Sequence, residues 1–130
     1  MAEVLIVDDD PDARGMLAFT LVDSGFQVRE AKDGEDALEE LRAHTPDCIL
    51  LDLMMPRLDG FKVLEAMRAE HLAVGIPVVV FSCKDEERSF VRVWELGADD
   101  YLTKPADPDA VALKVMRLLE AGTPAGRPSA

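Results

Sequence analysis

Five polar residues follow short apolar runs of the chain: Asp8, Asp9, Asp52, Ser82 and Lys104. Carboxylates without a nearby histidine or cysteine suit a hard cation such as Mg²⁺ better than zinc. A hydroxyl and an ammonium group can bind phosphoryl oxygens, and an aspartate can itself be a nucleophile that forms an acyl phosphate. Brought together, these side chains would have the inventory of phosphoryl transfer, in which positioning and charge neutralisation supply most of the catalysis.

Strands and helices alternate along the chain in the order that would assemble such a site. The strands are expected at Val4–Val7, Gln27–Ala31, Cys48–Leu51, Val78–Phe81 and Tyr101-Leu102. The amphipathic segments between them predict helices at Asp12–Ser24, Glu35–Ala43, Gly60–Glu70, Glu86–Leu96 and from Pro108 to just before Gly122. This repeat predicts an α/β fold, a doubly wound five-stranded parallel sheet whose strand ends bring the polar residues to one edge.

Local signals set several boundaries of these elements. Gln27–Ala31 alternates apolar and polar residues, which favours an edge strand, and Gly25 suits a left-handed helix cap. Asp33 can cap the second helix, and Asp107-Pro108 is typical of a helix start. Asp10 is assigned to the start of the first helix rather than to a metal.

Apolar positions in the helices are assigned to the core. In the fourth helix these are Phe90, Val93 and Trp94, at helical spacing. Cys48 lies within an apolar strand and is expected to be a small buried hydrophobe. Cys48 and Cys83 lack metal-site spacing and are too few for a disulfide scaffold, so both are expected to be free thiols.

Composition narrows the class of protein. The chain has 130 residues and a net charge of −12, without the basic footprint that nucleic-acid binding requires. It has no signal core and no apolar stretch long enough for a membrane span, so a cytoplasmic location without nucleic-acid or membrane contact is expected. One domain over residues 1–122 is predicted, and the Pro/Gly/Ser-rich residues 123–130 suggest a flexible tail or linker.

Four stretches together resemble the receiver domain of two-component response regulators. Asp9, Asp52, Ser82 and Lys104 follow one another at intervals of 43, 30 and 22 residues. Each stretch is weak by itself, but the ordered set is specific and covers residues 1 to about 121. The stretches are Val4–Pro11, Leu50–Pro56 with Asp59-Gly60, Val78–Ser82 and Gly97–Pro105. The resemblance implies a flavodoxin-like (βα)5 fold with strand order 2-1-3-4-5.

The resemblance also implies a phosphoacceptor and a metal site. Asp52 would accept a phosphoryl group from a sensor histidine kinase or a histidine phosphotransfer protein. Mg²⁺, or Mn²⁺ in its place, would be bound by Asp9 directly, by Asp8 through water, by Asp52 and by the main-chain carbonyl of Met54. The domain would assist its own phosphorylation and also its own autodephosphorylation, which would be slow. No separate turnover substrate is expected.

A phosphoryl-binding and switching set is implied in the same way. Lys104 would pair with Asp52 and then with its phosphoryl group, and Ser82 would donate a hydrogen bond to a phosphoryl oxygen. Tyr101 would be the aromatic residue that turns inward with Ser82, although ordinary packing is an alternative for it. The Lys104–Pro105 peptide bond is expected to be cis. The face of the fourth helix, fifth strand and fifth helix would serve a partner or a homodimer, and carries Arg92, Glu95, Asp99, Asp100 and Lys114.

Departures from the common family pattern bear on rate and output. Met54 and Lys84 flank the expected path of water toward the acyl phosphate, and Cys83 stands where a smaller alanine or glycine is frequent. The hypothesis is that these bulky groups set the lifetime of the acyl phosphate. Ala106 follows Lys-Pro where many DNA-binding regulators have phenylalanine, which weakens membership of that output class.

Two other functions fit part of the pattern. Asp8-x-Asp10 after an apolar run is similar to haloacid-dehalogenase-type phosphatases, but here Asp99-Asp100 precedes Lys104 instead of following it, and no cap insertion is present. A phosphorylation-independent module with the receiver shape usually lacks one of the acid pair, the acceptor or the lysine. All of these residues are present in this chain.

Overall fold

The computed structural model describes residues 2–82 and 87–120 and contains one five-stranded parallel sheet in the order β2-β1-β3-β4-β5. The strands are β1 (Glu3–Val7), β2 (Gln27–Ala31), β3 (Cys48–Asp52), β4 (Val78–Ser82) and β5 (Asp100–Thr103). The helices are α1 (Pro11–Asp23), α2 (Gly34–Ala43), α3 (Gly60–Glu70), α4 (Glu87–Glu95) and α5 (Pro108–Glu120). The predicted doubly wound sheet and its strand order are confirmed.

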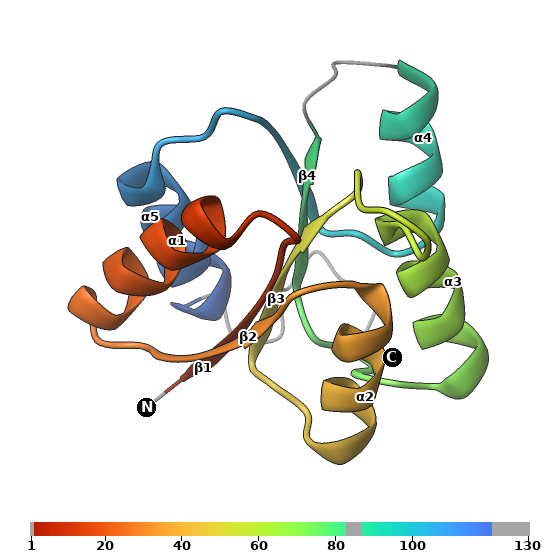
Figure 1. Cartoon of the computed structure of the whole chain (residues 1–130), viewed down its shortest axis with the longest axis horizontal. Helices are drawn as coiled ribbons and strands as arrows, with labels where there is room; N and C mark the ends of the chain where they lie inside the picture. The colour runs from red at the N-terminus through yellow and green to blue at the C-terminus, as the bar shows by residue number, and fades with distance from the viewer. Residues whose placement is uncertain (1, 83–86, 121–130) are drawn as a thin grey trace.

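Helices cover both faces of the sheet. Figure 1 shows α1 and α5 on one side of the strands and α2, α3 and α4 on the other. Successive strand residues point to opposite faces, so Val4 and Ile6 pack in the α1–α5 core, whereas Leu5 and Val7 pack in the core on the other side. Burial on both faces explains why these strands are continuous apolar runs in the sequence.

Strand β2 is at the edge of the sheet, as its alternating sequence predicted. It pairs with β1 in register from Glu3↔Gln27 to Val7↔Ala31. Gln27 and Glu30 are exposed, whereas Ala31 is fully buried. An edge strand tolerates this mixture because one side of its backbone has no neighbouring strand.

Aspartates cap the helices that follow β1, β2 and β3. The side chain of Asp33 accepts a hydrogen bond from the Asp36 amide at 2.8 Å, and Asp59 accepts one from the Lys62 amide at 3.0 Å. Asp10 caps α1 through the Asp12 amide at 3.0 Å, which agrees with its assignment to a helix start. Each side chain satisfies an amide that the first helical turn leaves without a partner.

Two details of the sequence reading were wrong. Trp94 was assigned to the core but is 42% exposed, whereas its neighbour Val93 is fully buried. Adjacent helical residues point about 100° apart, and the buried strip of α4 is too narrow to include both. Strand β5 begins at Asp100 and is longer than predicted, because Asp100 continues the pairing with Val79 of β4.

Several predictions concern residues outside the described ranges. These are the start of the fourth helix at Glu86, the roles of Cys83 and Lys84, and the tail at 123–130. Within the described residues, no helix combines the length and apolar character that crossing a membrane requires.

Candidate functional site

Three carboxylates converge at the carboxyl edge of the sheet. Asp8 and Asp9 follow β1, Asp52 is the last residue of β3, and one carboxylate oxygen from each lies within 4.8 Å of the others. Asp8 and Asp52 are 2% and 4% exposed, whereas Asp9 is open to solvent. An all-oxygen set with one exposed member fits a hard cation that keeps water ligands, so these residues suit Mg²⁺.

Lys104 bridges the two buried carboxylates. Its Nζ lies 2.7 Å from Asp8 Oδ2 and 3.2 Å from Asp52 Oδ2. The Lys104 amide donates to the Ser82 carbonyl at 2.7 Å, which fixes the chain just beyond β5 against the end of β4. Burial lowers the pKa of Lys104, but the hydrogen bonds and charges of Asp8 and Asp52 outweigh burial and raise it above the usual value.

Asp52 is held in a crowded and poorly solvated place. Its Oδ1 accepts a hydrogen bond from the Met54 amide at 3.0 Å. Burial raises the pKa of Asp52 and the nearby Asp8 charge adds to this, while the Met54 amide and Lys104 act in the opposite direction without cancelling it. Any further positive charge at the site would therefore stabilise the ionised form of Asp52.

Strand register explains how these residues meet. Val7 pairs with Leu51, Asp52 pairs with Phe81, and Ser82 pairs with Thr103, so the parallel strands end at a common edge. The first residue of α3 packs directly on this edge. A Cβ built on Gly60 would lie 2.6 Å from the Asp52 carbonyl oxygen, closer than real contacts allow, so only glycine fits there.

The remaining predicted residues lie around the acidic cluster. Ser82 is the last residue of β4 and is 3% exposed, and Tyr101 is half-buried against the core on the α2–α4 side. The Met54 side chain is 53% exposed, and the Lys104–Pro105 peptide bond is cis. Sequence reasoning missed Arg14, whose Nη1 donates to the Asp8 carbonyl oxygen at 2.7 Å.

The predicted interaction face contains ion pairs within the chain. Lys114 Nζ lies 2.8 Å from Asp100 Oδ2, which ties α5 to β5. Arg92 of α4 lies 2.6 Å from Glu65 of α3 and packs over the Phe61 ring. Arg92, Asp100 and Lys114 of this face therefore already have partners within the chain.

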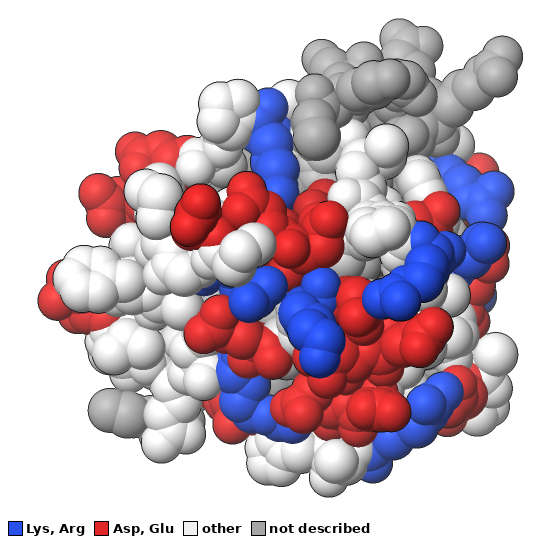
Figure 2. Space-filling model, in the orientation of Figure 1, with Lys and Arg blue, Asp and Glu red and all other residues white. Residues whose placement is uncertain are grey.

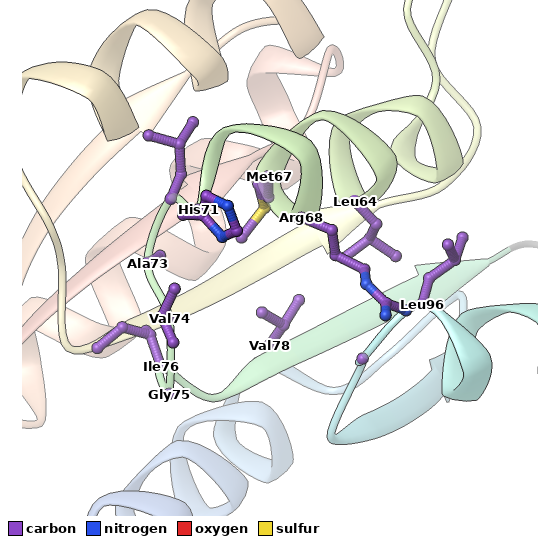
Figure 3. A pocket seen from close by; sticks show the side chains of 12 residues that line it. Leu64, Met67, Arg68, His71, Ala73, Val74, Gly75, Ile76, Val78 and Leu96 are labelled. Atoms are coloured by element: carbon purple, nitrogen blue, oxygen red, sulfur yellow. The ribbon is translucent and has the colours of Figure 1, made fainter. Parts of the chain in front are cut away.

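Two hollows differ in their relation to the acidic cluster. One of about 440 Å³ adjoins it, since Asp8 and Lys104 form part of a wall that is otherwise mainly apolar and includes Met16 and Phe81. The other, of about 380 Å³, is shown in Figure 3 and lies at the opposite end of the sheet beside Val78, the first residue of β4. Arg68 and His71 are its ionisable side chains, so it lacks the carboxylates that phosphoryl chemistry would need.

Acidic and basic side chains are interleaved on the face of the molecule seen in Figure 2. Blue groups are scattered among a larger number of red ones and do not form a continuous basic patch on this face. The view agrees with the negative net charge of the whole sequence.

Comparison with known proteins identifies the family. The sequence model of the response regulator receiver domain matches residues 4–116. The chain belongs to this family. It is 41% identical over 117 residues to the alkaline phosphatase synthesis transcriptional regulatory protein PhoP of Bacillus subtilis, covering 90% of this chain and 48% of that protein. It is 36% identical over 121 residues to the phosphate regulon transcriptional regulatory protein PhoB of Escherichia coli, covering 93% and 53%.

A solved receiver domain shows the same fold. The receiver domain of the Francisella response regulator 1452 superposes with a TM-score of 0.85 at 31% identity, covering 92% of this chain and 98% of that one. The chain thus spans about half the length of the curated relatives it matches and nearly the whole of a solved receiver domain. Receiver domains are the phosphoacceptor modules of two-component signalling, and this role follows for the chain from its family.

Proposed function

We propose that Asp52 is the residue that takes the phosphoryl group. The observation that carries the proposal is the geometry at Asp52, a buried carboxylate that lies 3.2 Å from the Lys104 ammonium and within 4.8 Å of two more carboxylates. Lys104 supplies a fixed positive charge for the phosphoryl oxygens, and the acidic pair supplies ligands for a cation. The donor is a phosphohistidine of a sensor kinase or a histidine phosphotransfer protein.

The transfer forms one bond at phosphorus and breaks another. A carboxylate oxygen of Asp52 attacks phosphorus and the bond between phosphorus and the imidazole nitrogen breaks. The donor histidine leaves with the electron pair of that bond as a neutral imidazole, because its other ring nitrogen carries a proton. The product is an acyl phosphate on Asp52. Lys104 then exchanges part of its contact with the carboxylates for the new phosphoryl oxygens, and the buried Ser82 hydroxyl donates to another of them.

A divalent cation completes this proposal. Asp8, Asp9, Asp52 and the Met54 carbonyl would hold Mg²⁺ or Mn²⁺, and the exposed position of Asp9 leaves room for water ligands. When bound, the cation supplies positive charge to the phosphoryl oxygens. The protein orients Asp52 through the Met54 amide and Lys104, and it keeps this carboxylate buried.

Phosphorylation is proposed to act as a switch in a signalling module. Ser82 and Tyr101 would move toward the phosphoryl group and change the surface formed by α4, β5 and α5, through a shift between two populated states. That surface is the proposed site of a partner or a homodimer. The domain bounds stay predictions, with a receiver domain at 1–122 and a tail at 123–130. A cytoplasmic location and the absence of direct nucleic-acid binding also stay predictions.

The acceptor assignment is tested by labelling with acetyl phosphate in the presence of Mg²⁺. Intact mass spectrometry should show one added phosphoryl group on the wild-type chain and none on Asp52→Asn. Asp59→Asn is the matched control, because asparagine caps a helix as well as aspartate and Asp59 follows in the same loop. Labelling that persists in Asp52→Asn would refute the assignment, and an unlabelled wild-type chain would favour a phosphorylation-independent module.

A further inference from the structure

Arg14 connects the acidic cluster to a strand that contributes no site residue. It stands at the end of the first turn of α1, and its side chain is 18% exposed. Nη1 donates to the Asp8 carbonyl oxygen at 2.7 Å, and Nε donates to Glu30 Oε1 at 2.9 Å. One planar guanidinium thus holds the turn between β1 and α1 against the end of β2.

Asp8 is the point at which the chain leaves the sheet, and each of its polar groups has a separate partner. Its amide donates to the Ala31 carbonyl at 3.2 Å, which is the last link between β1 and β2. Its carboxylate accepts from the Asp10 amide at 2.9 Å and from Lys104 at 2.7 Å. Its carbonyl oxygen accepts from Arg14, so this contact determines the path of the main chain toward Asp9.

Lys104 cannot be the permanent anchor of this turn. Its ammonium binds the Asp8 and Asp52 carboxylates, and under the proposed function it turns partly to the phosphoryl group. Arg14 binds a main-chain oxygen and a carboxylate outside the cluster, so neither contact competes with a cation or a phosphoryl group. The turn that carries Asp8 and Asp9 therefore keeps its position when Lys104 changes partners.

We propose that Arg14 is a positioning residue of the divalent-cation site, which holds the Asp8–Asp9 turn in the geometry that binds the cation. The inference rests on the proposed function, since it assumes that Asp8, Asp9 and Asp52 bind Mg²⁺. Residues that orient metal ligands from outside the coordination sphere typically change metal affinity by about 10- to 100-fold when they are replaced.

Three roles for Arg14 predict different effects on Mg²⁺ affinity. A positioning residue, once replaced, weakens binding whether or not the positive charge is kept. A residue that acts through its charge alone gives unchanged binding in Arg14→Lys and tighter binding in Arg14→Gln, because a repulsive charge is lost. A residue that only stabilises the fold leaves the Mg²⁺ dissociation constant unchanged in both variants.

The experiment measures Mg²⁺ binding by isothermal titration calorimetry, with the urea midpoint of the metal-free chain measured alongside. Arg14→Lys keeps the charge, but a single ammonium cannot reproduce the two-sided contact, so its dissociation constant should rise about tenfold. Arg14→Gln should bind at least as weakly. Arg42→Lys is the control, because Arg42 makes a similar two-bond pair with Glu70 between α2 and α3, away from the cluster, and its Mg²⁺ affinity should not change.

The outcomes separate this inference from the function on which it rests. Wild-type affinity in Arg14→Lys, or tighter binding in Arg14→Gln, would overturn the positioning role and leave the Mg²⁺ site intact. A wild-type chain that does not bind Mg²⁺ would overturn the proposed site together with the inference. Equal weakening in Arg14→Lys and Arg42→Lys would also count against it, because the effect would then not depend on contact with Asp8.

Discussion

The pKa values of Asp52 and Lys104 are both raised, which favours the neutral form of Asp52 and the charged form of Lys104. Burial opposes the charge of Lys104, but two carboxylates overcome it and the pKa of Lys104 rises. A raised lysine pKa stabilises the fold below the unfolded-state value of about 10.4, and this contribution is lost as pH rises through the folded-state value. For Asp52, burial dominates and its raised pKa means that ionisation costs stability. The carboxylate, not the ammonium, is therefore the group that needs further neutralisation.

At the residue scale, Cys48 should be inert in the folded chain. Burial raises the pKa of its thiol to about 12, and its side chain is fully buried in β3. Because the thiolate is the reactive form, alkylation by iodoacetamide at pH 8 should be at least about 10³-fold slower than in the unfolded chain. The measurement uses a Cys83→Ser background, so that only Cys48 can react. Equal rates with and without urea would contradict the prediction.

Met54 gives a second residue-scale prediction. Its amide donates a hydrogen bond to Asp52 Oδ1, and Met54 is 53% exposed to solvent. Met54→Asn keeps the main-chain contact and replaces a bulky apolar group with a polar one that can orient water, so loss of the acyl phosphate should be severalfold faster. The rate is followed by mass spectrometry after acetyl phosphate is removed. An unchanged rate would refute a role for this side chain in the phosphoryl lifetime.

At the element scale, the packing of α3 on β3 depends on Gly60. A Cβ at Gly60 would lie 2.6 Å from the Asp52 carbonyl oxygen and 2.7 Å from Leu53 Cα, which are main-chain atoms that cannot rotate away. Gly60→Ala should therefore destabilise the fold by about 1–3 kcal/mol in urea unfolding. Gly15→Ala is the control, because nothing lies within 4 Å of its Cβ in α1 and the change should stabilise by about 0.5–1 kcal/mol. Similar effects of the two changes would contradict this account.

Sequence reasoning recovered the elements wherever a local pattern determines them. Cys48–Leu51 of the buried strand β3 is a continuous apolar run, and the cap at Asp33 needs only residues within one turn. Trp94 was misassigned because the width of a buried strip depends on what packs against the helix. Arg14 was missed for a similar reason. Its partner Glu30 lies on β2, and their contact depends on strand register, which pairs Ile6 with Glu30.

At the scale of the whole molecule, the site belongs to the sheet as a unit. Two of its carboxylates follow β1 and a third ends β3, the nearby Ser82 ends β4, and the Lys104 ammonium follows β5. No single strand–helix pair holds the set together, so cation binding should be linked to global folding. At a Mg²⁺ concentration 100 times the dissociation constant, the free energy of unfolding should rise by about 2.7 kcal/mol. Calcium-free urea titrations with and without Mg²⁺ measure this, and an unchanged midpoint would exclude a site formed only by the folded chain.

Asp52→Asn should be more stable than the wild-type chain when metal is removed with EDTA at neutral pH. Burial raises the pKa of Asp52, so ionisation of this carboxyl costs stability in the folded chain. The cost is absent below the unfolded-state pKa of about 3.9, so wild-type stability relative to the variant should fall as pH rises from there to the raised folded-state pKa and stay constant above it.

Mg²⁺ should then reverse the order of stability, because the wild-type chain offers the cation a carboxylate that the variant lacks. Urea unfolding in EDTA and in excess Mg²⁺ measures both stabilities. A change in their order tests whether the Asp52 charge that destabilises the metal-free chain also binds the cation. If Asp52→Asn were less stable than wild type in EDTA at neutral pH, the Lys104 pair and the Met54 hydrogen bond would outweigh burial. The Asp52 charge would then stabilise the metal-free fold, and the fold would not need a cation to neutralise it.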